Sequence, residues 1–124
     1  MTWDDEVAAI KEMAQRRGVD WAFVAAIRKA ENGGDGRQFG VLSVEAATYE
    51  DQLMVCCNSV AHRLDEYPAN PVGRRDGRLV YREGFIDYFA RHWAPIGADN
   101  DPSGLNANWT NNVEAFYAQF ANEG

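Results

Sequence analysis

Hydrophobic side chains recur along most of this chain with the i, i+3, i+4 spacing that is typical of one face of an α-helix. In the N-terminal part, the repeating positions are Trp3, Val7, Ile10 and Ala14, followed by Trp21, Val24, Ile27 and Glu31. Gly18 after two arginines predicts the end of the first helix, and Asp20 predicts the N-cap of the second. The glycine-rich residues 33–36 predict the end of the second helix, and residues 37–43 are expected to form a loop or a short β excursion.

The rest of the chain continues this helical pattern. Thr48 with Asp51 has the spacing of a capping box and predicts the start of the longest helix. Its hydrophobic positions are Tyr49, Leu53, Cys56, Val60 and Leu64, and those of two later helices are Phe85, Ile86, Phe89 and Trp93, then Val113, Phe116, Tyr117 and Phe120. Thr110 is expected to cap the last helix. The sequence predicts a mainly α, single domain over residues 1–124, with about five helices and a short β-turn excursion after the second.

Composition restricts the classes of function. The chain has 124 residues, of which 46% are hydrophobic and 25% charged, with a formal net charge of −7. An acidic balance of this kind argues against nucleic acid or an anionic membrane surface as the partner. We expect no membrane insertion, because no apolar run approaches the roughly 20 residues that span a bilayer. The first residues have neither the basic region nor the apolar segment of a signal peptide, so synthesis in the cytoplasm is expected.

The cysteines suggest packing rather than chemistry. Cys56 and Cys57 are adjacent, and neighbouring side chains on a helix diverge too far for an ordinary disulfide. With only His62 and His92 as distant further ligands, a zinc site is not expected. We interpret both cysteines as small buried hydrophobic residues of a helix.

One carboxylate has an unusual position for a surface residue. Glu31 continues the apolar positions of Val24 and Ile27, and it is the last residue before Asn32 and the glycines. Burial and the negative end of the helix dipole would both disfavour the charged carboxylate. A carboxyl group that keeps its proton near neutral pH is suited to general acid catalysis. The alternative is an exposed residue on a frayed last turn.

These residues also resemble a known group of enzymes. The segment 26–34, which ends in Glu31-Asn32-Gly33-Gly34, and the turn 39–43 are similar to the catalytic segment of lysozyme-like peptidoglycan hydrolases, more narrowly phage lytic transglycosylases and goose-type lysozymes. The stretch 93–109 is similar to a segment of phage and prophage members. The resemblance covers most of residues 20–120. It departs from the family at Ser43, where many transglycosylases have Gln, and by lacking their Ala-Tyr-Asn-Ala-Gly segment.

The resemblance implies cleavage of the glycan strands of bacterial peptidoglycan, between N-acetylmuramic acid and N-acetylglucosamine, with Glu31 as general acid and base. A transglycosylase would need no second carboxylate, because the 6-hydroxyl of the sugar closes an anhydro ring. A hydrolytic lysozyme would use one of three further candidates, which are Asp35, Asp99 and Asp101. The expected substrate-binding residues are Phe39, Gly40, Val41, Trp93, Asn100, Asp101 and Trp109. Tyr88 is a further candidate sugar platform, and the alternative for every aromatic residue is a place in the core.

No cofactor is expected. Residues 99–104 have the alternating oxygens and the sixth-position glycine of a calcium loop, but the twelfth position is Thr110 instead of glutamate. Asx turns that fold this long polar loop explain these residues better.

With no signal peptide, the protein is expected to reach the wall through a holin lesion, inside a virion or by some other route. The alternative from a different functional class is a non-catalytic phage structural or wall-binding module that retains the same scaffold.

Overall fold

The computed structural model describes residues 1–42, 45–67, 84–93 and 107–122, except for the side chains of residues 91 and 107. These residues form helices and turns, and none of them is in a β-strand. The helices are α1 (Trp3–Arg17), α2 (Trp21–Glu31), α3 (Tyr49–Glu66), α6 (Ile86–Trp93) and α7 (Ala107–Asn122). The mainly α class with five helices is therefore confirmed.

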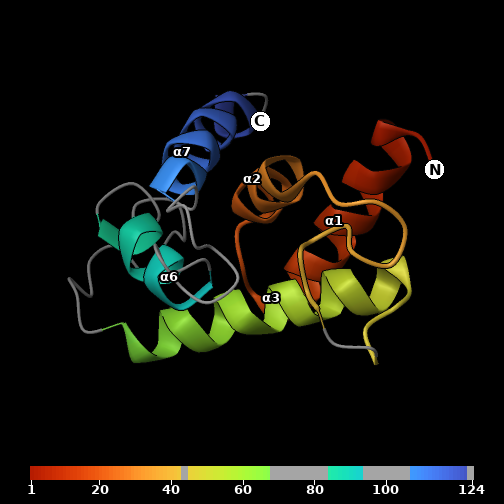
Figure 1. Cartoon of the computed structure of the whole chain (residues 1–124), viewed down its shortest axis with the longest axis horizontal. Helices are drawn as coiled ribbons and strands as arrows, with labels where there is room; N and C mark the ends of the chain where they lie inside the picture. The colour runs from red at the N-terminus through yellow and green to blue at the C-terminus, as the bar shows by residue number, and fades with distance from the viewer. Residues whose placement is uncertain (43–44, 68–83, 94–106, 123–124) are drawn as a thin grey trace.

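Helix α2 is the centre of the domain (Figure 1). Its residues from Ala22 to Ile27 are all buried, and it packs most extensively against α7 and also against α1 and α3. In Figure 1, α3 runs beneath α1 and α2, with α6 and α7 toward its C-terminal end. Because a helix that is apolar all round must be covered on every side, this arrangement explains why the continuous apolar segment of α2 is central.

Most of the predicted helix ends are found. Gly18 caps α1 with φ of 69°, and the Asp20 side chain accepts a hydrogen bond from Ala22 N at the start of α2. Thr48 Oγ1 accepts from Asp51 N at the start of α3, 3.1 Å away. The chain also has a complete capping box at the start of α1, between Thr2 and Asp5, which the sequence reading missed.

One predicted cap is wrong. Thr110 does not cap the last helix, because α7 already begins at Ala107 and Thr110 lies inside it. The physical reason is Trp109, which is buried one helical turn before Val113 and extends the apolar face of α7 toward its N-terminus. Packing of this indole against the core thus outweighs the capping preference of a threonine.

The segment between α2 and α3 folds as turns in its described residues, 32–42 and 45–48. Of the two predictions for this segment, the loop is the one found, and none of its described residues is in a strand. Phe39 is fully buried, and its ring centroid lies 5.6 Å from that of Tyr49. This buried phenylalanine fixes the turn against the start of α3.

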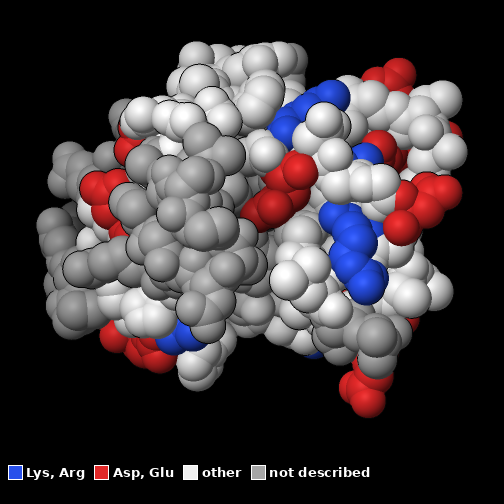
Figure 2. Space-filling view, viewed as in Figure 1, with Lys and Arg blue, Asp and Glu red and all other residues white. Residues whose placement is uncertain are grey.

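Charged side chains are dispersed on the side of the molecule that Figure 2 draws. Figure 2 shows acidic and basic side chains scattered among uncharged ones on the side of the molecule that it draws, rather than gathered in a basic patch. Among the described helices, none is both long enough and apolar enough to cross a bilayer.

Candidate functional site

Glu31 is the last residue of α2, where Asn32 ends the helix in the left-handed conformation, with φ of 49°. The Glu31 side chain is half-buried. The alternative, an exposed residue on a frayed last turn, is therefore not found. Its Oε2 atom accepts two hydrogen bonds, from Trp93 Nε1 at 3.0 Å and from Trp109 Nε1 at 2.9 Å. The two indoles come from the end of α6 and the start of α7, so three helices meet at this carboxylate.

Gly40 lies against the other oxygen of the same carboxylate. A Cβ atom on Gly40 would stand 2.4 Å from Oε1 and 2.6 Å from Cδ of Glu31. Gly40 also has φ of 78°, in the left-handed region that side chains disfavour. Glycine is therefore required here twice, for its backbone conformation and for the close approach to the acid.

The surroundings raise the pKa of Glu31 above its usual value. Burial is the largest cause, and the hydrogen bonds from Trp109 and Trp93 oppose it by stabilising the charged form. Among the described residues Oε1 accepts no hydrogen bond, and it stands at the negative end of α2. The carboxyl group thus keeps its proton to higher pH than an exposed glutamate, as a general acid requires.

The turn that presents Gly40 is held by a buried glutamine, Gln52 of α3, which is 0% exposed. Its Oε1 accepts from the backbone N–H groups of Phe39 at 3.1 Å and Val41 at 3.2 Å, on either side of Gly40. Its Nε2 donates to the carbonyl oxygens of three turn residues, which are Gly36, Val41 and Ala46. These bonds add to the two backbone hydrogen bonds within the turn, from Arg37 N to the Gly34 carbonyl oxygen at 2.9 Å and from Gly40 N to the Arg37 carbonyl oxygen at 3.0 Å.

Arg28 holds the first part of the same segment. Its Nε donates to Glu6 of α1 at 2.7 Å, and its guanidinium also donates to the carbonyl oxygens of Gly33 and Gln38, both at 3.2 Å. Gly33 leaves no room for a side chain, because a Cβ there would lie 1.7 Å from the Arg37 carbonyl oxygen. The glycines and Arg28 thus fold the chain tightly back after Glu31.

The structure brings four of the predicted site residues together, namely Glu31, Gly40, Trp93 and Trp109. Val41 lies beside them, half-buried and bonded to Gln52. Phe39, which the sequence predicts as a substrate-binding residue, has its ring wholly enclosed in the core, where an apolar side chain is most stable.

Other predicted residues do not join this cluster or cannot be placed. Asp35 is exposed in the turn after α2. Tyr88 is half-buried, and its hydroxyl donates to Glu66 at 2.7 Å. Asp99, Asn100 and Asp101, with the whole calcium-like segment 99–104, lie outside the described residues.

Gln52 and Arg28 were missed by sequence reasoning, although Gln52 left a signal. It stands three residues after Tyr49 and four before Cys56, on the apolar face of α3. A polar residue at such a position must find hydrogen-bond partners inside the protein. Arg28 left no comparable signal, because its partners come from α1 and from a loop.

The cysteines behave as predicted, since both are buried and free. Burial raises the pKa of the Cys57 thiol to about 12, and it also raises the pKa of the Cys56 thiol well above its usual value. Within the described ranges, no group of three or more His, Cys, Asp or Glu side chains is arranged to hold a metal ion.

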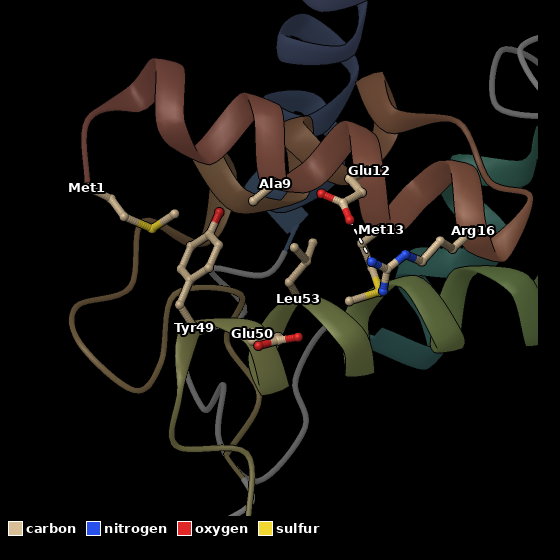
Figure 3. A pocket seen from close by; sticks show the side chains of 8 residues that line it. All are labelled: Met1, Ala9, Glu12, Met13, Arg16, Tyr49, Glu50 and Leu53. Carbon is tan, nitrogen blue, oxygen red and sulfur yellow. Dashed lines mark hydrogen bonds and ion pairs between the residues drawn. The ribbon is translucent and has the colours of Figure 1, made fainter.

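A separate hollow of about 380 Å³ lies between α1 and the start of α3 (Figure 3). Apolar side chains such as Met13 and Leu53 line it, and the Glu12–Arg16 ion pair lies along one side. That pair is exposed on a single helix, so it is weak and solvent-screened. The hollow has none of the buried acid chemistry found at Glu31.

With this geometry established, the chain was compared with protein-family models, curated proteins and solved structures, and no match was found in any of the three.

Proposed function

We propose that this chain is a lysozyme-like domain that cleaves the glycan strands of bacterial peptidoglycan, with Glu31 as the general acid and base. The supporting observation is the environment of that carboxyl group, which is half-buried with a raised pKa and is fixed on one oxygen by two indole N–H groups. Glycosidic cleavage needs a proton delivered to the leaving oxygen as positive charge develops on the sugar ring. A protonated, oriented Glu31 is suited to deliver it.

The second half of the reaction separates two versions of this proposal. In a lytic transglycosylase, the Glu31 carboxylate takes the proton of the sugar's own 6-hydroxyl, which attacks the anomeric carbon. In a lysozyme, water attacks instead, and a second carboxylate is usual. The single buried acid of the described site favours the first version, since the candidate Asp35 is exposed in its turn.

The test uses purified cell walls. Wild type should reduce their turbidity, and the Glu31→Gln variant should not. Glu114→Gln is the matched control, since it makes the same substitution at an exposed position of α7. Mass analysis of the released fragments then assigns the reaction, because an anhydro end is lighter than a reducing end by one water. Wild-type lysis by Glu31→Gln would overturn the assignment.

A second candidate is a phage structural or wall-binding module without turnover. The net charge of −7 favours it, because wall polymers are polyanionic and repel an acidic protein that must move along them. Sedimentation with purified walls distinguishes the two. If wild type binds the walls without cutting their glycan strands, and Glu31→Gln binds equally well, the result supports the module over the enzyme.

A further inference from the structure

We infer that Trp93 and Trp109 are positioning residues that hold Oε2 of Glu31 as a pure acceptor and so assign the transferable proton to Oε1. The inference deepens the proposed function and rests on it where catalysis is concerned. It differs from the expectation from the sequence, in which both rings were candidate platforms for sugar stacking.

The assignment follows from counting donors and acceptors. An indole nitrogen can only donate, and a carbonyl-type oxygen can accept two hydrogen bonds. Trp93 at 3.0 Å and Trp109 at 2.9 Å both donate to Oε2, so its acceptor positions are filled. A proton on Oε2 would compete with these donors. The neutral acid therefore has its C=O at Oε2 and its O–H at Oε1, next to Gly40.

The two indoles are themselves held in place by packing. Phe89, which is 1% exposed, stacks on both of them, with ring centroids 5.4 Å from Trp93 and 6.2 Å from Trp109. Trp109 is buried, so little of its face is open to a sugar ring. An indole that is fixed on its face and bonded at its nitrogen serves better to orient a carboxylate than to bind substrate.

Among the described residues, few groups lie against this carboxylate. The groups that face it are the Trp93 indole of α6, the Trp109 indole of α7, the backbone of Gly40 and, from α3, the Cys56 thiol. Burial and the charge of Glu31 keep that thiol protonated. The two N–H groups are thus the specific stabilisers of the Glu31 anion among the described residues.

Indole N–H signals test this arrangement without any assay of activity. The chain has four tryptophans. In a ¹⁵N-labelled protein titrated with acid, the signals of Trp93 and Trp109 should shift with the same midpoint as the Glu31 side-chain carboxyl carbon. The signals of Trp3 and Trp21 should not follow it, and in Glu31→Gln none should. Trp93 and Trp109 signals that ignore the Glu31 titration would overturn the inference.

Substitution gives a second, directional test. Trp93→Phe and Trp109→Phe each remove one donor to the charged form, so each should move the Glu31 titration to higher pH. Trp21→Phe is the matched control, because Trp21 begins α2 and lies about 15 Å along the axis from Glu31. The titration midpoint of Glu31 in this variant should equal that in wild type. No shift, or a downward shift, in both site variants would contradict the positioning role.

Kinetics on soluble glycan fragments separates positioning from sugar binding. Loss of positioning should lower kcat about tenfold or more with little change in KM, whereas loss of a sugar platform should raise KM. A rise in KM alone would overturn the inference. If wild type cuts no glycan but both tryptophan signals follow Glu31, the proposed function fails while the proton assignment stands.

Discussion

Helix α2 begins at one carboxylate and ends at another, and α7 contacts both. Asp20 Oδ1 accepts from Ala22 N at 3.0 Å, and its Oδ2 accepts from the Tyr117 hydroxyl at 2.9 Å. At the other end, Glu31 accepts from Trp109, eight residues before Tyr117 on the same helix. Helix α7 therefore runs antiparallel to α2 and donates an aromatic hydrogen bond at each end.

The two carboxylates differ in what the helix does to them. Asp20 stands at the positive end, where backbone N–H groups and the dipole stabilise an anion. Glu31 is partly buried, which raises its pKa, and it stands at the negative end, where the dipole disfavours an anion. The distribution of donors differs as well: both oxygens of Asp20 are engaged, whereas both donors of Glu31 meet on Oε2. Similar chemistry thus makes a structural cap at one end and, under the proposed function, the proton donor at the other.

The largest expected effect separates these two roles directly. Glu31→Gln should reduce wall lysis by about a thousandfold, within the range for loss of a general acid. Its melting temperature should be unchanged or higher, because an acid held at the wrong helix end is a strained feature. Asp20→Ala should do the reverse, with lysis retained per folded molecule and stability lowered by about 1 kcal/mol. Turbidity assays and thermal melts on both variants measure this contrast. Equal loss of lysis in both variants would contradict the proposed difference between the two carboxylates.

A pair of glycines tests the close approach at the reactive end. Gly40 and Gly18 both have positive φ, of 78° and 69°, but a Cβ on Gly18 meets no atom within 4 Å. Each change to alanine should cost about 1 kcal/mol of stability for the left-handed backbone. Only Gly40→Ala should also displace the Glu31 carboxyl, lowering lysis by about tenfold to a hundredfold. Gly40→Val should lower it further. Normal lysis by both Gly40 variants would remove this turn from the site.

The third prediction concerns how the two ends are stabilised. Asp20 caps its own helix, whereas the turn that places Gly40 against Glu31 is held by Gln52 of another helix. Gln52→Leu should leave buried peptide groups without partners and cost about 3 kcal/mol. The control Asn58→Ala changes an exposed position of the same helix and should stay within about 0.5 kcal/mol. Urea denaturation measures both, and a Gln52→Leu protein as stable as the control would show that the turn holds without it.

The helices could be predicted from sequence because each depends mainly on local information. Periodicity placed all five, and Gly18, Asp20 and Thr48 marked their ends. The error at Thr110 has a tertiary cause, since the packing of Trp109 extends α7 by about one turn. Local capping preferences are weak compared with the burial of an indole.

The site was predictable only in part. Glu31 and Gly40 were predictable because an acid on an apolar helix face and a glycine in a short turn can be recognised from the sequence alone. The bonds from Trp93 and Trp109 were not, because they span 62 and 78 residues and depend on how α6 and α7 pack. The burial of Phe39 was not predictable either, since an aromatic residue in a loop gives no sign of whether its ring is covered.

The smallest expected effect is the pH dependence of stability that Glu31 adds. Its folded pKa is raised, so its contribution to stability is complete below the unfolded value of about 4.3 and is lost as pH rises through the folded value. Between the unfolded and the folded pKa of Glu31, the free energy of unfolding of wild type should therefore fall relative to that of Glu31→Gln. Above the folded pKa, the difference between the two proteins should stay constant. Other titrating groups, such as Asp5 and Glu66, are present in both proteins and cancel in the difference. Urea melts at a series of pH values measure it, with Asp20→Ala as a background in which the same difference should persist. If wild type instead gains stability over Glu31→Gln as pH rises, the two indole donors outweigh burial, and the two ends of α2 treat their carboxylates alike.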